Sequence, residues 1–269
     1  SLATPAQQKR LLGAMPNRPM KAAKNQRTKA LSGNVILPSQ FDWRNVTYHP
    51  SVPNGNYVSK VRNQGGCGSC VLFATTAGLE TKIAIQYKTP NAEYDLSEQV
   101  AISCAATQTP IAGWDLCGQG YWVEDAMLNL TQQGLPPEAN YPYKASNGKC
   151  AEATPLWEKR AYKIKQYQSI YTENLSQEEG VKQLKQGLYL YGPLVTRFNV
   201  YSDFFSYAGG VYQQAFGTPV GGHAVTIVGW SDPEQAFIVK NSWGNNWGES
   251  GYFKIGYSEL KSPVAFAQS

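Results

Sequence analysis

Residues 63–70 read Asn63-Gln64-Gly65-Gly66-Cys67-Gly68-Ser69-Cys70, and a long apolar stretch follows directly. That stretch, residues 70–88, carries apolar side chains around much of a helical circumference, so we expect a helix buried in the protein centre. The chain contains five cysteines, and because disulfides consume cysteines in pairs, at least one thiol is left over. A cysteine on the first turn of a buried helix, directly after a glycine-rich turn, is a candidate nucleophile.

The charge of the chain is distributed unevenly. Residues 1–40 hold seven of the 24 basic residues and no acidic residue, which leaves 17 basic against 19 acidic residues in the remainder. The formal net charge of +5 therefore describes a cationic arm on a slightly acidic body. The arm has no Phe, Tyr or Trp, and without aromatic side chains for base stacking it does not favour nucleic-acid binding. A flexible N-terminus and a segment that lies on its own acidic body remain open.

The two halves of the 269-residue chain differ in pattern. The first half predicts helices at 70–88, after Ser97 as an N-cap, and at 122–130. In the second half, a capping box from Ser176 to Glu179 predicts the start of one helix, and the remaining pattern predicts strands at 162–171, 194–201, 223–230, 236–240 and 251–255. This order predicts an α+β protein of two lobes with a cleft between them. No run of about 18 apolar residues is found, so no membrane association is expected.

Thiol catalysis needs a base, and the chain has only His49 and His223. His49 lies in a polar loop and is expected at the surface, whereas His223 opens an apolar strand after two glycines. Asn241 ends the following strand, so a hairpin would place it beside His223 to fix the imidazole tautomer. Trp243 could shield that hydrogen bond, and the Gln64 amide with the Cys70 backbone N–H could hold an oxyanion.

Three sequence blocks carry a family resemblance. They are Gln64–Cys70, Gly222-His223-Ala224-Val225, and the run from Asn241-Ser242-Trp243-Gly244 to Gly251-Tyr252. Together they resemble the signature blocks of papain-family cysteine proteases. The resemblance implies that Cys70 is the nucleophile, His223 the acid–base, Asn241 its orienting partner and Gln64 an oxyanion donor. It also implies a helical left lobe, an antiparallel β-barrel-like right lobe, and an active-site cleft between them. We place the left lobe at 38–150 and the right lobe at 151–269.

The resemblance also implies the state of each cysteine. Cys67 would bridge to Cys117 and Cys104 to Cys150, which leaves Cys70 free. Gly120, Tyr121, Ala224 and Trp243 would contact substrate, with an apolar preference in the second subsite.

This chain departs from the family pattern at several positions. Val71 stands where Trp is usual, Gln119 replaces a glycine, and the right-lobe bridge of many relatives has no cysteines here. No histidine pair follows Cys104, so endopeptidase activity is expected rather than carboxydipeptidase activity.

The same residues also fit other interpretations. Cys67 and Cys70 alone could form a thioredoxin-like redox pair, but the His223 and Asn241 blocks favour the nucleophile. A zinc site would need a second closely spaced ligand pair, and a papain-fold binding protein without turnover is the alternative function. We expect a monomeric cysteine endopeptidase that acts on protein or peptide substrates and uses no metal or organic cofactor. An oxidising compartment is expected: secreted, periplasmic or lysosome-like. Sequons at Asn45, Asn129 and Asn174 leave glycosylation open.

Residues 1–37 lie upstream of the part that resembles mature family members. They are expected to form an inhibitory, prosegment-like arm in the cleft, so that the protein is a zymogen. Attraction between the basic arm and the acidic body would assist docking at low ionic strength. A disordered N-terminus is the alternative.

Overall fold

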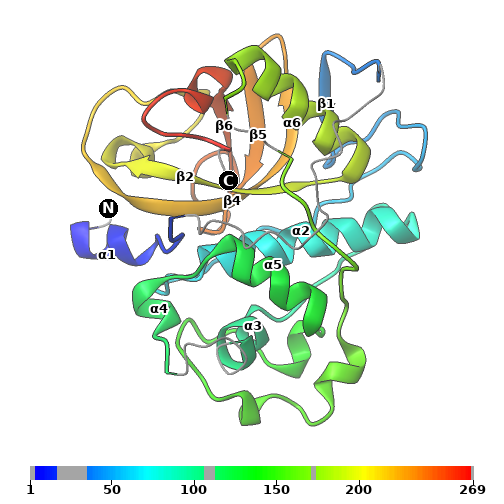
Figure 1. Ribbon diagram of the computed structural model, residues 1–269, viewed down its shortest axis with the longest axis vertical. Helices are drawn as coiled ribbons and strands as arrows, with labels where there is room; N and C mark the ends of the chain where they lie inside the picture. Colours follow the sequence, from blue (N-terminus) through cyan, green and yellow to red (C-terminus); the bar gives the residue numbers. More distant parts are fainter. Residues whose placement is uncertain (1–3, 17–34, 106–112, 171–173, 268–269) are drawn as a thin grey trace.

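The computed structural model describes residues 4–16, 35–105, 113–170 and 174–267. Figure 1 shows a lower part made of helices and an upper part built on a β-sheet, with helix α2 along the boundary between them. The mixed fold class expected from the sequence is therefore confirmed.

The helical part is organised around α2 (Cys70–Tyr87), which is buried on most of its surface. Because this helix is apolar nearly all round, it can lie between the other helices and the sheet without exposing a polar face. Ser97 accepts a hydrogen bond from the Val100 N–H at 3.1 Å and so starts the next helix, as its N-cap pattern predicts. The remaining elements here are α3 (Glu98–Ala105), α4 (Leu116–Gln119), α5 (Val123–Gln132), and the 3₁₀ turns η1 (Glu138–Asn140), η2 (Cys150–Glu152) and η3 (Trp157–Arg160).

The sheet contains six strands in the described chain: β1 (Gln40–Asp42), β2 (Leu194–Tyr201), β3 (Val211–Tyr212), β4 (Pro219–Ser231), β5 (Ala236–Lys240) and β6 (Tyr252–Gly256). The order is β1-β4-β5-β6-β3, and β2 pairs with the first part of β4. All pairs are antiparallel except β3 with β6. The sheet is open rather than a closed barrel. Helix α6 (Gln177–Tyr191) has its capping box at Ser176 and Glu179, and η4 (Ser202–Ser206) and η5 (Tyr257–Leu260) complete this part.

Each of the two hydrophobic cores includes residues from both halves of the chain. The core under the sheet includes Phe41, Trp43 and Tyr57, which precede α2. The core among the helices includes Ala153 and Trp157, which follow residue 150. A single division at residue 150 is therefore only approximate, because each lobe takes a segment from the other half of the chain.

The strand expected at 162–171 does not form within the described residues. Tyr162 makes one antiparallel bridge to Leu135, and residues 163–170 are irregular. The Ile164 N–H donates to Leu130 at the end of α5, so this segment follows a helix instead of a strand partner. Tyr171 lies outside the described residues.

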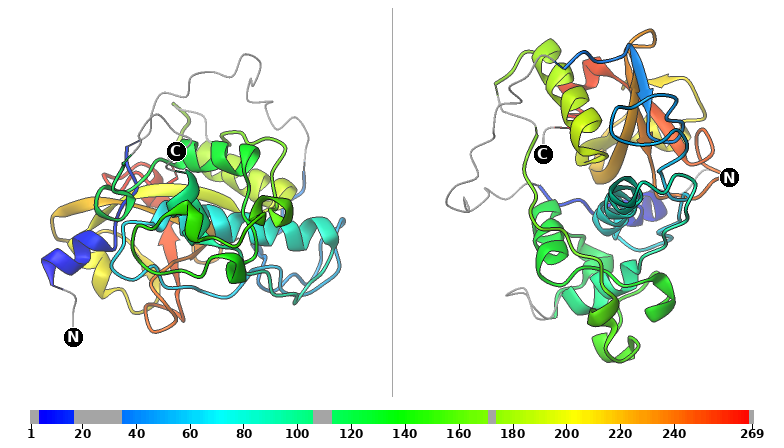
Figure 2. Two further views of the ribbon diagram at one scale, coloured as in Figure 1. Left: turned by 90° about the horizontal axis from the view of Figure 1, so that it is seen from below. Right: turned by 90° about the vertical axis from the view of Figure 1, so that its right-hand side faces the viewer.

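None of the helices in the described ranges combines the length and hydropathy needed to cross a membrane. The N-terminal segment begins with α1 (Pro5–Arg10), which Thr4 and Gln7 cap reciprocally. Figure 2 shows α1 at one end of the boundary between the helices and the sheet, away from the other helices. The segment that follows α1 therefore enters the molecule at this boundary.

Candidate active site

Cys70 is the first residue of α2 and is fully buried. Burial raises the pKa of its thiol to about 12, although the backbone N–H groups of Ala224, Val71, Cys70 itself and Ala14 act in the opposite direction. Cys70 is thus a neutral thiol in this structure. The contact with Ala224 places the thiol beside the strand that carries His223.

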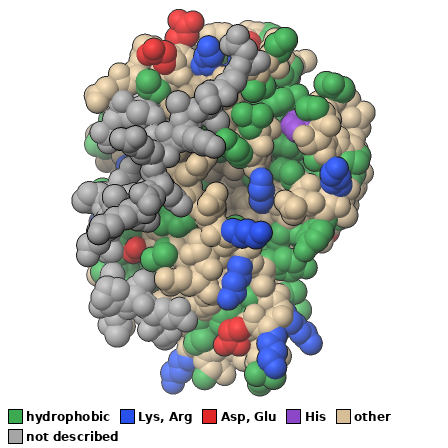
Figure 3. Space-filling view, turned by 45° about the vertical axis from the view of Figure 1, so that its right-hand side comes forward, with side chains coloured by type: hydrophobic (Ala, Val, Ile, Leu, Met, Phe, Trp, Pro, Cys, Tyr) green, Lys and Arg blue, Asp and Glu red, His purple; other side chains and the backbone are tan. Residues whose placement is uncertain are grey.

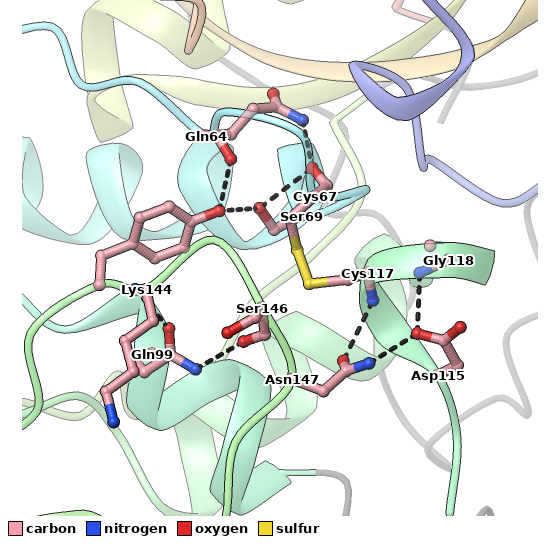
Figure 4. The surroundings of a disulfide bond; sticks show 12 residues. Gln64, Cys67, Ser69, Gln99, Asp115, Cys117, Gly118, Lys144, Ser146 and Asn147 are labelled. Atoms are coloured by element: carbon pink, nitrogen blue, oxygen red, sulfur yellow. Dashed lines mark hydrogen bonds between the residues drawn. A yellow bond between two sulfur atoms is a disulfide. The ribbon is translucent and has the colours of Figure 1, made fainter. Parts of the chain in front are cut away.

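The other four cysteines form two disulfides, Cys67–Cys117 and Cys104–Cys150, the pairs that the resemblance implies. Cys70 is the free cysteine among the described residues. Figure 4 shows how the first disulfide ties the loop before α2 to α4, where Asn147 Oδ1 accepts from the Cys117 N–H and Asp115 Oδ1 accepts from the Gly118 N–H. The position of the thiol is therefore fixed from both sides of the glycine-rich turn.

His223 and Asn241 lie on neighbouring strands and are hydrogen bonded. His223 Nε2 lies 2.7 Å from Asn241 Oδ1. The Ser242 N–H donates to the same oxygen at 2.8 Å, which identifies it as the acceptor and leaves the ring proton on Nε2. His223 Nδ1 has no hydrogen-bond partner within the described chain, so its lone pair is available for a proton.

The histidine is completely buried, and this burial lowers its pKa to about 4 despite the bond to Asn241. The Trp243 ring lies 4.7 Å from the His223 ring, centroid to centroid. Trp243 therefore covers the His223–Asn241 bond, as the sequence suggests for it. His223 is a neutral imidazole here.

Gln64 is also fully buried and is held by residues of both lobes. Its Nε2 donates to the Cys67 carbonyl at 2.9 Å, and its Oε1 accepts from the Ser242 hydroxyl at 2.7 Å. The Tyr143 hydroxyl donates to the Gln64 carbonyl at 2.6 Å and lies 2.8 Å from Ser69 Oγ (Figure 4). Sequence analysis missed Ser242 and Tyr143, because neither residue type signals a positioning role alone.

Residues 11–15 of the arm pass through this site. The carbonyl oxygen of Leu11 accepts from Gln64 Nε2 at 3.2 Å and from the Trp243 indole at 3.3 Å. The N–H groups of Gly13 and Ala14 each donate to Gly222 at 3.1 Å. The arm therefore occupies the position between Gln64, Trp243 and the strand that leads to His223.

On the helical side the arm pairs with Tyr121. The backbone N–H of Tyr121 donates to the Gly13 carbonyl at 2.8 Å, and the Tyr121 carbonyl accepts from the Met15 N–H at 2.9 Å. The two bonds form a parallel β-bridge between Ala14 and Tyr121. Leu12 and Ala14 are buried by these contacts. The arm is held by main-chain pairing and apolar burial in its described part.

The fit is tight enough to require glycine. A Cβ on Gly13 would lie 2.1 Å from the Gly68 carbonyl oxygen, and one on Gly120 would lie 2.0 Å from that of Gly13. Such separations are impossible between real atoms, so these main chains touch directly. Of the other expected contact residues, Ala224 is buried against the same core as Ala14, and the Tyr121 hydroxyl accepts from Asn129.

His49 differs from the surface residue expected from the sequence. It is half-buried against Phe41, Trp43 and Tyr189, and its Nε2 lies 3.1 Å from the Tyr189 carbonyl. It packs on the sheet core, separate from the residues that surround Cys70.

The surface in Figure 3 is mixed, with basic side chains in its centre and lower half and hydrophobic ones between them.

Known proteins are similar to most of the chain. Residues 37–265 match the family described as papain family cysteine protease. The chain is 32% identical over 260 residues to a cathepsin B-like protein, CP3, of Giardia intestinalis, covering 88% of this chain and 76% of that protein. It is 32% identical over 227 residues to a cathepsin L-like proteinase of Fasciola hepatica, covering 83% of this chain and 62% of the relative.

Solved structures include forms that are named procathepsins. Procathepsin L2 from the larval midgut of Tenebrio molitor superposes with a TM-score of 0.75 at 28% identity, covering 98% of this chain and 78% of that one. ProCathepsin B S9 from Trypanosoma congolense also gives 0.75, at 22% identity, and covers 97% and 86%. The second likeness supports the fold alone.

Proposed function

Because the chain belongs to the papain family of cysteine proteases, we propose that it is an endopeptidase whose Cys70 thiolate hydrolyses peptide bonds and whose residues 1–37 keep it latent. One observation carries the proposal: the Leu11 carbonyl lies on the Gln64 amide, where an oxyanion donor would hold a substrate carbonyl. The protein-derived segment in this place supports both a peptide-binding cleft and its blockage.

The proposed catalytic steps give a role to each of these groups. His223 Nδ1 takes the Cys70 proton, and the thiolate attacks the carbonyl carbon of the scissile bond. Gln64 Nε2 and the Cys70 backbone N–H stabilise the oxygen as it becomes negative. Imidazolium then protonates the leaving amine, and the same residue activates water to hydrolyse the thioester. Asn241 keeps the His223 ring and tautomer in place throughout.

The arm prevents these steps in two ways. The main chain of Ala14, whose N–H donates to the Gly222 carbonyl at 3.1 Å, lies beside the Cys70 thiol and occupies space that a scissile bond would need. Exclusion of water also keeps thiol and imidazole neutral, because burial raises the pKa of the one and lowers that of the other. Restoration of the thiolate–imidazolium pair therefore requires the arm to leave.

The range of substrates and the location follow from the same features. The chain has no histidine other than His49 and His223, so a carboxylate-binding histidine pair is absent from its sequence and endopeptidase activity is favoured. Two disulfides and cathepsin-like relatives suggest an oxidising compartment, lysosomal or secreted.

The test is labelling with a thiol-directed epoxide together with hydrolysis of a mixed peptide library. We expect the full chain with Gly13→Val, which displaces the arm, to take one label and to cleave within peptides. The same chain with Cys70→Ala should do neither. A Gly13→Val chain that binds peptides but takes no label and cleaves nothing would instead be a papain-fold binding protein.

A further inference from the structure

A basic side chain, Arg197, lies in the cleft beside the arm. A Cβ on Gly222 would lie 2.2 Å from the Ala14 carbonyl oxygen and 3.0 Å from Arg197 Nη2, so both atoms lie directly beside the Gly222 main chain. Since Gly222 precedes His223, the guanidinium lies next to the arm and close to the catalytic residues.

The strand register explains why Arg197 faces the cleft. It stands opposite Ala224 in the antiparallel pair of β2 with β4, and opposed residues project to the same face. Ala224 lies in the core that includes Cys70 and Ala14, and Val195, two residues earlier on β2, packs on this core against Gly78 of α2. Side chains on one face of a strand recur every second residue, so Arg197 continues this face from Val195 toward the N-terminal end of α2, where Cys70 lies.

The surroundings of Arg197 contain charge from the opposite lobe. Burial lowers the pKa of the half-buried guanidinium, while Glu124, on the first turn of α5, and Cys70 raise it. Arg197 Nη2 also donates to Asn199 Oδ1 at 3.2 Å. Glu124 follows Tyr121 and Trp122 at the start of α5, so its charge acts on Arg197 from the helical side of the cleft.

We propose that Arg197 determines specificity by binding an acidic side chain of the substrate in the subsite lined by Tyr121 and Ala224. This rests on the proposed function, and it adds a positive charge to a subsite for which Tyr121 and Ala224 provide apolar surface. A guanidinium can hold a carboxylate with two parallel hydrogen bonds, an arrangement that a neutral amide of the same shape matches poorly. The subsite would accept Glu or Asp two residues before the scissile bond.

The experiment compares matched peptides in the full chain that carries Gly13→Val. The peptides differ only two residues before the scissile bond, which is Glu, Gln, Leu or Lys. We expect kcat/KM for Glu to exceed that for Gln by about tenfold or more, since hydrogen bonds to charged groups are stronger than neutral ones. The Glu/Gln ratio is taken within each variant, so differences in active fraction cancel.

Substitutions then assign the preference to a residue. With Arg197→Gln the ratio should fall to about one, with Arg197→Lys it should be intermediate, and with Glu124→Gln it should rise because the competing carboxylate is gone. A Glu/Gln ratio of one before any change at Arg197, or a ratio that survives Arg197→Gln, would overturn the proposal. If none of the four peptides is hydrolysed and the epoxide does not label Cys70, the proposed peptidase function fails instead.

Discussion

The main chain of Gly13 lies directly against that of Gly68, two residues before the nucleophile. A Cβ at Gly13 would lie 2.1 Å from the Gly68 carbonyl oxygen and 2.6 Å from its carbonyl carbon. Backbone atoms on both sides leave no flexible group to move aside. The arm can therefore occupy the cleft in this form only with glycine at this position.

Gly13→Val is accordingly expected to displace the arm and activate the full chain. Overpacking of this kind costs about 1–3 kcal/mol, which lowers the equilibrium constant for docking of the arm by roughly fivefold to 150-fold. The measurement is the rate of peptide hydrolysis by the full chain. Ala6→Val is the control, because it enlarges a small side chain on the exposed surface of α1. It should leave the rate unchanged. Equal rates for both variants would contradict the arm's inhibitory role.

The second prediction concerns the reactivity of the Cys70 thiol. Only the thiolate is alkylated, and with the arm in place burial raises the thiol pKa to about 12. At pH 7–8 we expect the full chain to react slowly with iodoacetamide, and Gly13→Val to react much faster, with its rate profile shifted to lower pH. Cys70→Ser is the control for other sites. Superimposed pH profiles for the full chain and Gly13→Val would show that the arm does not set the pKa.

The sequence predicts which residues form this site and that the arm lies in the cleft, but not which contacts hold the arm there. Cys70, His223, Asn241 and Gln64 could be recognised because each lies in a local pattern, at a helix start, a strand start or a glycine-rich turn. The pairing of Ala14 with Tyr121 joins residues more than 100 positions apart and uses main-chain atoms, which carry no residue signature. Leu11 and Leu12 are adjacent apolar residues in the arm, but nothing in the neighbouring sequence shows where they bind.

The strands show the same limit. The bounds predicted for β2 and β5 match the observed bounds. Both strands have regular apolar patterns, and both pair with β4 in the structure. The strand expected at 162–171 has a suitable composition, but its neighbours in space are α5 and Leu135 rather than a free strand edge. Arg197 was overlooked because its significance comes from β-sheet register, which a single sequence does not reveal.

Acid is expected to release the arm through His223. Burial lowers the His223 pKa from its ordinary value of 6.5 to about 4. In Cys70→Ala protein, where no thiol can give its proton to the imidazole, the docked state binds fewer protons than the open state between these values. Docking is therefore fully stable above about pH 6.5 and weakens as the pH falls toward 4, by up to about tenfold per unit. Hydrogen exchange of the Ala14 and Met15 amides, corrected for intrinsic rates, measures this opening.

His223→Gln supplies the control for acid release, because glutamine keeps a polar side chain that does not titrate. In this variant, protection of the two amides should be independent of pH between 6.5 and 4. The same acid-dependent loss of protection with and without His223 would assign the effect to another group.

Gln64 offers a test of transition-state stabilisation. In the Gly13→Val background, Gln64→Ala should lower kcat by about 10²–10³ with a smaller change in KM, because an oxyanion donor acts mainly in the transition state. Ser242→Ala removes only the hydroxyl that holds Gln64 Oε1 at 2.7 Å, so a loss of roughly tenfold is expected. Steady-state kinetics separate kcat from KM. A change confined to KM in Gln64→Ala would mean that Gln64 binds the ground state instead.

The last prediction concerns stability at the interface of the lobes behind Asn241. Lys240 is buried and donates to Ser59 Oγ at 2.9 Å, and the Ser59 hydroxyl donates to buried Glu80, which also accepts from the Leu96 N–H. Burial raises the pKa of Glu80 and lowers that of Lys240, so each depends on the other to remain charged. Glu80→Ala leaves an uncompensated buried cation and should cost about 3–5 kcal/mol in the free energy of unfolding.

A matched substitution on the surface separates burial from charge. Glu93 pairs with Arg62 at 3.0 Å but is exposed, so Glu93→Ala should cost about 0–1 kcal/mol. Urea unfolding of Cys70→Ala protein, which avoids self-digestion, measures both values. Replacement of the pair together, Glu80→Leu with Lys240→Met, should be less destabilising than Glu80→Ala alone, because no unpaired charge remains buried. If Glu80→Ala and Glu93→Ala destabilise equally, the buried pair does not contribute as its geometry indicates.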